Sequence, residues 1–232
     1  MTNHPSFSEC RGYVAANMHG RSRPAKTARH LPAVTISRQA GARGRTIGLK
    51  LQEALRARDS KSEIPWTLFD DNLVQQVLED HQLPKDLEKF MPDDAVGELE
   101  STINELLGRH PSLWTLFEKT AQTMVRLSRM GHTILVGRGG NEVTRGFSNV
   151  LRVRLIGSEP RRQRQMMQVQ DMTESEARKF VKEEDTARRR FIRQHFNTDI
   201  DDPMRYDLVI NTDNFSDDCI VQQLMAALEG KR

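Results

Sequence analysis

The most constraining feature of this 232-residue sequence is an apolar run that leads into a glycine-bearing loop and then into a helical pattern. The run 33–36 is rich in β-branched residues, and glycines follow at Gly41, Gly44 and Gly48. Apolar residues then recur at helical spacing over 47–55. Strand, glycine-bearing loop and helix form a phosphate cradle, because backbone N–H groups converge there and the helix adds the partial positive charge of its N-terminus.

The loop matches the pattern G-x-x-x-x-G-K-[ST] only in part. Gly41 and Thr46 supply a glycine and a hydroxyl, but Gly44 stands where we place the lysine, two residues before Thr46 rather than one, and Arg45 is then the nearest cation. Thr46 has the hydroxyl that a phosphate-bound Mg²⁺ takes as a ligand. A strand-to-helix turn whose glycines serve only steric needs would look the same, so the loop alone leaves both interpretations open.

Size and composition indicate one soluble α/β domain or a core with a small insertion. Hydrophobic residues make up 37% of the chain and charged residues 29%. No run approaches the roughly 20 apolar residues of a membrane helix, so no membrane association is expected. Cys10 and Cys219 lie far apart and show no metal-ligand spacing. Neither a disulfide framework nor a zinc site is therefore expected, and the predicted location is a reducing cytoplasm.

The positive charge of the chain is concentrated at its start. Residues 1–32 carry five Arg or Lys and one Glu, so the rest is close to neutral although the net charge is +3. The segment mixes Ser, Asn, Gly, Pro and Arg without apolar periodicity, which favours a disordered basic tail. It has no continuous apolar segment of the secretory kind. An organelle-type presequence or a nucleic-acid-binding arm stays open as an alternative.

Strand and helix patterns alternate along the remainder of the chain, which we expect to be a single domain over 33–232. The alternation predicts a doubly wound, five-stranded parallel sheet with helices on both faces. The segment 72–110 is predicted to be a helical insertion. The other predicted strands are 66–69, 133–136, 150–156 and 206–211, and helices are expected up to Arg58, from Ser112 to a stop at Gly131, after Ser158, from a capping box at Thr173 to Phe196, and after Ser216.

Several charged residues stand at the ends of predicted strands. Asp70 and Asp71 follow 66–69, where open α/β sheets bind ligands, although Asp70 could equally cap a helix that begins near Asn72. Arg138 lies between glycines after 133–136, and an anion-binding role is favoured over a structural salt bridge. The long charged helix must be mostly solvated, but three residues separate Asp185 from Arg188, so these two share a face.

Four segments together resemble the cytidylate kinase-like family of P-loop nucleotide kinases. The loop with glycine in place of lysine, followed by arginine, resembles that family's own variant, whereas ordinary cytidylate kinases keep the lysine. The likeness extends over roughly residues 33–230. The segments are ISRQAGARGRTIG (36–48), LFDDNLV (68–74), ILVGRGGN (134–141) and KEEDTARRRFIRQHF…YDLVINT (182–212).

The resemblance implies transfer of the γ-phosphoryl group of ATP to a nucleoside monophosphate, with CMP or dCMP as the nominal acceptor and Mg²⁺ as cofactor. Backbone amides of the loop would hold the donor β-phosphate, Thr46 would ligate Mg²⁺, and Arg45 would supply the charge of the missing lysine. Arg162 resembles the arginine at the entry to the lid, which covers 160–197. The implied donor-binding residues are Gly41, Ala42, Arg43, Gly44, Arg45, Thr46 and Arg162.

On the acceptor side, the resemblance assigns phosphate binding to arginines. Arg138 matches the glycine–arginine motif that grips the acceptor phosphate, although Gly139 replaces the aspartate of ordinary cytidylate kinases. Asp185 and Arg188 match the Asp-x-x-Arg of the lid helix, which contacts the acceptor sugar and phosphates. Arginine suits this work because its planar guanidinium meets phosphate oxygens bidentately. The catalytic residues implied are Arg45, Arg138 and Arg188, and the substrate-binding residues are Asp70, Arg138, Asp185 and Arg188.

Two other functions stay open at this point. A nucleotide-binding regulator with little turnover would explain the missing lysine. A nucleic-acid-binding protein could use the basic tail and the arginine-rich helices, but the near-neutral core and the aromatic content of only 6% disfavour a base-stacking platform. The expected partner is therefore a nucleoside monophosphate, and nucleic acid is not expected.

Overall fold

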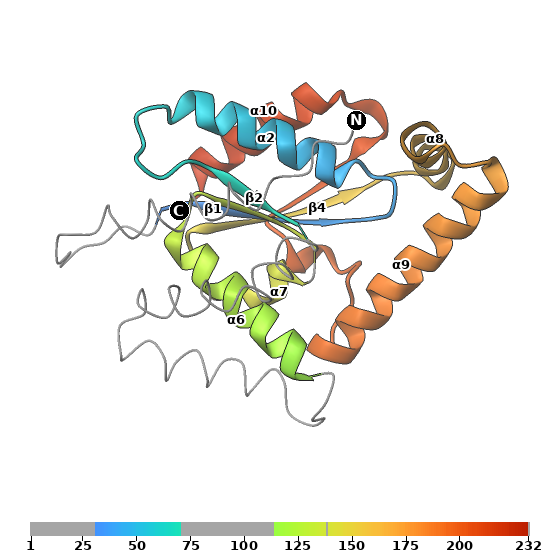
Figure 1. The fold of residues 1–232 in the computed structure, drawn as a ribbon, viewed down its shortest axis with the longest axis horizontal. Coiled ribbons are helices and arrows are strands. Elements are labelled where there is room, and N and C mark those ends of the chain that lie inside the picture. Colours follow the sequence, from blue (N-terminus) through green and yellow to red (C-terminus); the bar gives the residue numbers. More distant parts are fainter. Residues whose placement is uncertain (1–30, 71–113, 138, 232) are drawn as a thin grey trace.

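The computed structural model describes residues 31–70, 114–137 and 139–231. Five strands form one sheet in the order β2-β3-β1-β4-β5, and every neighbouring pair is parallel (Figure 1). The predicted parallel sheet is thus confirmed. The strands are β1 (Ala33–Arg38), β2 (Thr67–Phe69), β3 (Thr133–Val136), β4 (Val150–Ile156) and β5 (Leu208–Asn211).

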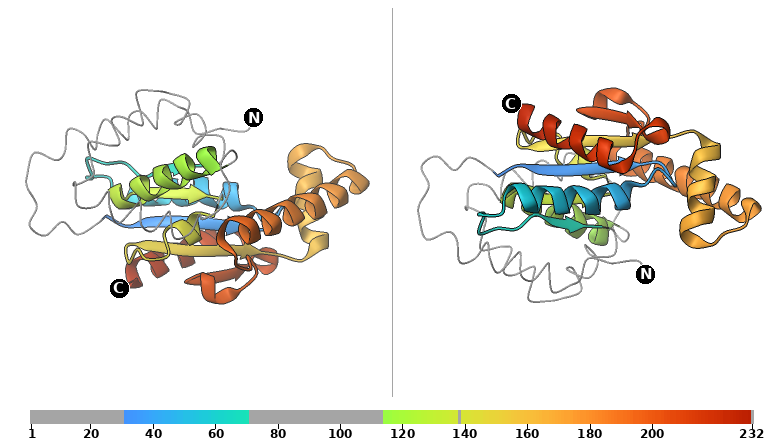
Figure 2. Two further views of the ribbon diagram at one scale, coloured as in Figure 1. Left: turned by 90° about the horizontal axis from the view of Figure 1, so that it is seen from below. Right: turned by 90° about the horizontal axis from the view of Figure 1, so that it is seen from above.

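Helices cover both faces of the sheet, as the alternating pattern predicts. α2 (Gly44–Arg58) and α10 (Asp217–Gly230) lie side by side on one face, and α6 (Trp114–Met130) and the short α7 (Gly140–Val143) lie on the other (Figures 1 and 2). α8 (Glu159–Gln170) and α9 (Glu174–Phe196) form a helical hairpin, here called the lid hairpin, that projects beyond the carboxyl edge of the sheet (Figure 2). Two 3₁₀ turns, η1 (Pro203–Arg205) and η2 (Thr212–Asn214), flank β5.

The core forms where α2 and α10 press their apolar faces on the sheet. Ile47, Leu51 and Leu55 recur every fourth residue on α2 and are fully buried against strand residues such as Val34 and Leu68. Strands buried on both faces must be apolar throughout, and β3 (TILV) has no exposed residue. The same burial fixes where the loop after β1 emerges.

That loop lies at the centre of the sheet's carboxyl edge. β1 is the middle strand, with β3 on one side and β4 on the other, so connections from β1 and β3 leave in opposite directions. Open α/β sheets bind ligands in the crevice at such a switch point. The loop predicted to cradle phosphate is therefore in the right place.

Most predicted element ends agree with the structure, and three differ for local reasons. β1 continues through the polar Ser37 and Arg38, because both pair with β4. The last strand begins at Leu208 rather than Tyr206, because η1 turns the chain just before it. Ser158 occupies the N-cap position of α8 without a side-chain hydrogen bond to that helix; its backbone N–H donates to Asp213 instead.

Other end signals are confirmed. Thr173 and Glu176 form both hydrogen bonds of the capping box at the start of α9, and the Ser216 side chain accepts from the backbone of Cys219 at the start of α10. Gly131 takes φ +74° directly after α6. The predictions for the tail up to residue 30, for the insertion 72–110, for a helix start at Ser112 and for Arg138 lie outside the described residues. Within the described ranges no helix is both long and apolar enough to span a membrane.

Candidate functional site

The loop between β1 and α2 has the backbone of an anion cradle. Gly41 (φ +76°) and Arg43 (φ +59°) are left-handed and stand on either side of Ala42, an alternation that turns backbone N–H groups toward one side. Position 41 requires glycine, because a Cβ there would lie 2.4 Å from the carbonyl oxygen of Arg162. Arg43 is the N-cap of α2 but makes no side-chain hydrogen bond to its first turn, so those N–H groups face the cradle. Residues 39–46 are called the phosphate loop below.

The Arg43 side chain anchors the phosphate loop on the α10 side. Its guanidinium donates to Asp217 Oδ1 at 2.6 Å and to the carbonyl oxygens of Thr212 and Phe215 at 2.5 and 2.9 Å. These bonds tie the loop to the turn between β5 and α10. The backbone N–H of Arg43 can therefore bind an anion, while its side chain stabilises the loop.

A buried ion pair of the lid hairpin holds the other side of the phosphate loop. Asp185 Oδ1 accepts from the backbone N–H of Ala40 at 2.8 Å, and Asp185 Oδ2 accepts from Arg162 Nη1 at 2.7 Å. The same Arg162 nitrogen donates to the Ala40 carbonyl at 3.0 Å. Both backbone groups of Ala40 are thus bound by lid residues, and the side chains of Arg162 and Asp185 are each only 9% exposed. We call this arrangement the latch.

The latch shows how the predicted Asp-x-x-Arg pair is placed. Asp185 and Arg188 do share a face of α9, with Asp185 Oδ1 and Arg188 Nη1 3.8 Å apart. The Asp185 carboxylate, however, faces the phosphate loop and Arg162, whereas Arg188 donates to Glu184 at 2.8 Å and extends along a pocket wall. The two residues therefore serve different neighbours.

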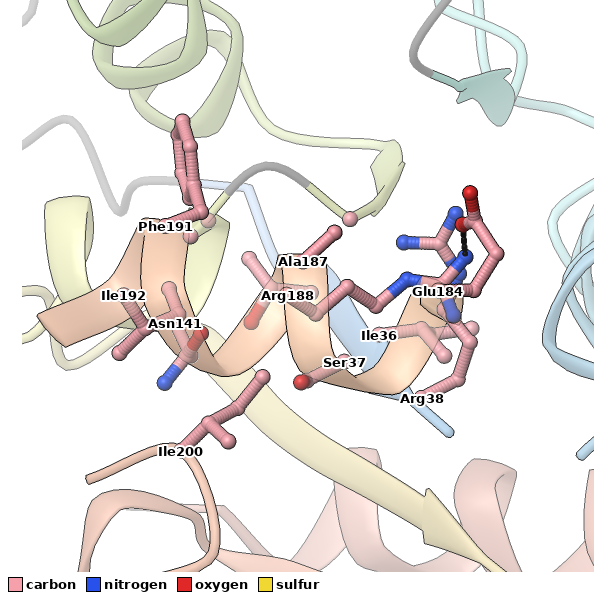
Figure 3. A pocket seen from close by; sticks show the side chains of 14 residues that line it. Ile36, Ser37, Arg38, Asn141, Glu184, Ala187, Arg188, Phe191, Ile192 and Ile200 are labelled. Carbon is pink, nitrogen blue, oxygen red and sulfur yellow. Dashed lines mark hydrogen bonds and ion pairs between the residues drawn. The ribbon is translucent and has the colours of Figure 1, made fainter. Parts of the chain in front are cut away.

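A pocket of about 280 Å³ lies between α9 and the carboxyl ends of β1 and β3, and we call it the α9 pocket. Figure 3 shows Arg38, Arg188 and Glu184 at one end of it and Phe191, Ile192 and Ile200 at the other. One end is thus charged and the other apolar. The remaining lining residues are Thr35, Ile36, Ser37, Gly137, Gly139, Gly140, Asn141 and Ala187. Arg138 belongs to the segment between two of these glycines but lies outside the described residues.

Gly139 departs from the Gly-Arg-Asp of ordinary cytidylate kinases for a packing reason. Its φ is +74°, and a Cβ there would lie 2.5 Å from the ring of Phe196 and 3.3 Å from Ile192. The last turn of α9 thus packs directly on the backbone at this position, which leaves no room for an aspartate.

A second hollow, also about 280 Å³, lies on the other side of the phosphate loop, and we call it the α8 hollow. Its walls combine arginines of α8 with the turn after β5, and Phe215 is 43% exposed there. Gly41 and Arg43 form the edge that it shares with the loop. The other lining residues are Arg161, Arg162, Arg164, Gln165, Gln168, Thr212 and Asp213.

The remaining predicted residues lie near the first turn of α2. Arg45 Nε is 3.8 Å from Asp70 Oδ2, so the cation expected to replace the lysine approaches the carboxylate that follows β2. Thr46 is exposed and Ala42 is buried. The structure brings the loop, Arg45 and Asp70 together, and their predicted roles toward ATP stay predictions.

A buried arginine ties the pocket wall to the lid hairpin. Arg154, 4% exposed, donates to Ser37 Oγ at 2.9 Å and to Asp201 Oδ1 at 2.8 Å, while Arg189 of α9 donates to Asp201 Oδ2 at 2.8 Å. Burial alone would raise the pKa of Asp201, but the hydrogen bond from Arg189 and the charges of both arginines leave that pKa below its ordinary value. Asp201 therefore stays ionised and bridges sheet and lid.

A model of the cytidylate kinase-like family matches residues 33–214, which is most of the chain. The chain belongs to the cytidylate kinase-like family. The expectation from sequence resemblance is thereby confirmed, and family membership supports a nucleotide-using phosphotransferase. None of the curated proteins matches this sequence.

Among solved structures, one of an uncharacterized protein from Eubacterium ventriosum is similar, with a TM-score of 0.66 and 15% identity over 85% of this chain and 98% of that one. This likeness confirms the fold. A shikimate kinase from Bacteroides thetaiotaomicron (TM-score 0.46, 16% identity) covers 85% of this chain and 98% of its own. A gluconokinase from Sinorhizobium meliloti (TM-score 0.44, 13% identity) covers 87% of this chain and 94% of its own. These two say nothing about the substrate of this family member.

Sequence reasoning missed several residues that line the two candidate pockets. Arg38, Phe191 and Ile200 line the α9 pocket and Phe215 lines the α8 hollow, yet none was predicted. Arg38 had a usable signal, since it is a cation at the carboxyl end of the central strand. Phe191 and Ile200 had none, because apolar residues near a helix end are most often core residues.

The described residues fit a metal held mainly by phosphate. No group of three or more His, Cys, Asp or Glu side chains within 31–70, 114–137 and 139–231 could hold a metal ion. Mg²⁺ in phosphoryl-transfer sites usually has few protein ligands, because nucleotide oxygens and waters fill its octahedral shell. A single hydroxyl at Thr46, next to an anion cradle, fits that donor set.

Proposed function

We propose that this protein transfers the γ-phosphoryl group of ATP to a nucleoside monophosphate, with CMP or dCMP as the nominal acceptor. The observation that carries the proposal is a pair of pockets of similar volume, one lined by Gly41 and Arg43 of the phosphate loop and the other by Arg38 directly before it. Phosphoryl transfer needs donor and acceptor aligned on either side of the moving group, with positive charge around it. One hollow edged by the phosphate loop and another that reaches Arg38, directly before the loop, suit that requirement.

On the donor side, ATP would occupy the α8 hollow and the phosphate loop. The N–H groups of Gly41 and of residues 43–46 would hold its β-phosphate, while the Ala42 N–H donates to the Gln39 carbonyl oxygen. Mg²⁺, held by Thr46 and the phosphates, would neutralise charge on the phosphate oxygens. The base would lie between Phe215 and the α8 arginines Arg161 and Arg164, where stacking on the ring and on guanidinium planes favours an aromatic base.

On the acceptor side, the monophosphate would occupy the α9 pocket. Its phosphate belongs at the charged end, where Arg188 contributes a guanidinium. Arg138 keeps the predicted role of binding the acceptor phosphate, but it lies outside the described residues. Its less polar nucleoside would lie toward Phe191, Ile192 and Ile200. The division of the pocket into a charged and an apolar end supports an acceptor built in the same way.

The latch gives Asp185 and Arg162 a positioning role in this reaction. Because these two residues bind both backbone groups of Ala40, the lid hairpin in this position fixes the backbone of the phosphate loop at Ala40. Closure over the loop would exclude water, which strengthens charge–phosphate interactions and prevents hydrolysis of ATP. This role replaces the direct contact of Asp185 with the acceptor that family resemblance implies.

An acceptor screen tests the proposal. Purified protein is supplied with Mg·ATP and, in turn, CMP, dCMP, UMP and AMP, while ADP release and the nucleoside diphosphate product are measured. We expect CMP or dCMP to give the highest kcat/KM. Calorimetry with ATP runs in parallel, and ATP binding without phosphorylation of any monophosphate would instead support a nucleotide-binding regulator.

A pair of lid-helix variants sharpens the screen. Arg188→Ala should raise the KM for the acceptor and lower kcat, by about 100-fold in kcat/KM, because it removes a cation from the acceptor phosphate. Arg193→Ala removes an exposed arginine from the same helix and should change little. Equal kinetics of the two variants would contradict the assignment of the α9 pocket to the acceptor.

A further inference from the structure

The glycine that replaces the P-loop lysine has a steric cause. A Cβ on Gly44 would lie 2.8 Å from Cγ of Arg38, 3.1 Å from its Cβ and 3.3 Å from its Cδ. The aliphatic stem of Arg38 thus runs across the backbone at the lysine position. While Arg38 stays in place, residue 44 can carry no side chain.

Arg38 and Gly44 stand on either side of residues 39–43. Arg38 is the last residue of β1, and Gly44 is the first residue of α2. A lysine at 44 would reach back over the loop toward residue 38, whereas here an arginine at 38 reaches forward over residue 44. The two arrangements place a cation over the same stretch of loop from opposite ends.

The Arg38 side chain also faces the α9 pocket, where the proposed acceptor binds. It lines the α9 pocket at the charged end with Arg188 and Glu184 (Figure 3). The loop cations have different neighbours: Arg43 donates to Asp217, and Arg45 approaches Asp70. Arg38, at the end of β1, lies on the side where the proposed acceptor enters.

We propose that Arg38 is a catalytic residue that replaces the missing lysine. Its guanidinium binds the phosphoryl group that moves from the donor to the acceptor. This inference rests on the proposed function. In the transfer, an acceptor phosphate oxygen forms a bond to the γ-phosphorus while the bond to the β,γ-bridging oxygen breaks and its electron pair leaves with ADP. Arg38 stays protonated throughout and stabilises the negative charge that spreads over the transferring group.

The test uses substitutions that separate the charge of Arg38 from its packing. Arg38→Met keeps a long stem over Gly44 but removes the charge, and should lower kcat about 100-fold. It should also weaken ATP binding more than ADP binding, measured by calorimetry. Arg38→Lys should retain more activity than the Met variant. Arg178→Ala, which removes an exposed arginine of α9, is the matched control and should leave both readouts unchanged.

A charge swap gives the most direct evidence. Arg38→Gly alone should lose activity, and Arg38→Gly combined with Gly44→Lys should regain at least tenfold of it, because the combined change removes the Arg38 stem that crowds position 44 and places a lysine there instead. Thermal melting of each variant checks that it is folded. If the Met variant melts early, the comparison between the Gly variant and the swap decides.

The outcomes separate this inference from the proposed function. Wild-type turnover with an unchanged kcat in Arg38→Met, or a swap that regains nothing, would overturn the role of Arg38 alone. If the wild type phosphorylates no monophosphate, the proposed function fails, and the ratio of ATP to ADP affinity in Arg38→Met still decides whether Arg38 binds the terminal phosphate.

Discussion

The sheet and the lid hairpin of this protein are held in different ways. The sheet and its covering helices share a large apolar cluster that includes Leu51, Leu68 and Leu224, all fully buried. The small core of the lid hairpin consists of Met166, Ala177 and Val181 packed on Ala40, with partly buried Met167, Met172 and Phe180 around it. Directional polar bonds supplement it: the latch and the Asp201 bridge.

The difference shows that the sheet core mainly stabilises the fold, whereas the polar bonds of the lid hairpin mainly set the geometry of the candidate site. Apolar burial is non-directional and depends on area, so the sheet core stabilises the fold without selecting a loop conformation. The lid bonds are directional. The latch ends on the phosphate loop, and Arg189 of α9 donates to Asp201, which also accepts from Arg154 of β4; Arg154 in turn donates to Ser37 in the α9 pocket. The position of the lid is therefore coupled to the geometry of the site, and four predictions test this division.

The largest effect is expected in the sheet core. Leu51→Ala should lower the free energy of unfolding by about 3 kcal/mol, because it leaves a cavity in a fully buried cluster. If the lid opens without the sheet, the variant destabilises the native state and the lid-open state equally. The hydrogen-exchange rates of the α9 amides should then stay unchanged. Urea denaturation and hydrogen exchange measure the two quantities. Val181→Ala is the matched lid variant, and should speed α9 exchange. Equal acceleration of α9 exchange by both variants would mean that lid and sheet open together.

The latch should give the next largest effect. Asp185→Asn keeps an acceptor for the Ala40 N–H but removes the charge that pairs with buried Arg162, which should favour lid opening by about 2 to 3 kcal/mol. Exchange of α8 and α9 amides should then accelerate about 30- to 150-fold. Glu183→Gln, at an exposed neighbouring position, is the control. Unchanged lid exchange in Asp185→Asn would show that the latch does not hold the lid.

The sheet has a charged clamp of its own, remote from the lid, and acid should break it. Hydrogen bonds from Arg152 and Lys231 outweigh the opposing effect of burial and lower the pKa of Asp207 to about 2. Because the pKa of Asp207 is lower in the folded protein than in the unfolded chain, where it is near 4, Asp207 stabilises the fold when the pH is above about 4. This stability is lost as the pH falls from about 4 to 2.

We expect the clamp to contribute about 1 to 2 kcal/mol, since Asp207 is partly exposed and solvent screens its charge. Asp207→Asn should therefore lower the free energy of unfolding at neutral pH by that amount and flatten its decline between pH 4 and 2. Urea denaturation across this pH range measures both. If the free energy of unfolding declines equally with pH in wild type and variant, Asp207 does not contribute to the acid sensitivity.

The smallest effect compares two helix starts within the lid. Thr173→Ala should cost about 1 kcal/mol, because Thr173 forms a complete capping box with Glu176. Ser158→Ala should cost only a few tenths, because that N-cap makes no side-chain hydrogen bond to its helix. Thermal melting of the two single variants compares them. An equal loss would show that side-chain capping at α9 contributes nothing beyond the backbone.

The sequence determined every described strand of the sheet and most helix ends. A β-branched run before a glycine-bearing loop, the apolar run 133–136 and the box at Thr173 each act within a few residues, so local hydrogen bonding and burial patterns suffice to read them. Family resemblance added which loop and which arginines to examine.

Only the tertiary structure decided what those residues contact. Asp185 binds the backbone of a residue 145 positions away, Gly139 lies under Phe196, and Arg38 crosses Gly44. Such contacts depend on how whole helices dock on the sheet, and a side chain's type and spacing say nothing of the partner that docking brings to it. The sequence therefore predicted which loop is the candidate phosphate cradle, while packing between distant elements fixed which side chains lie around it.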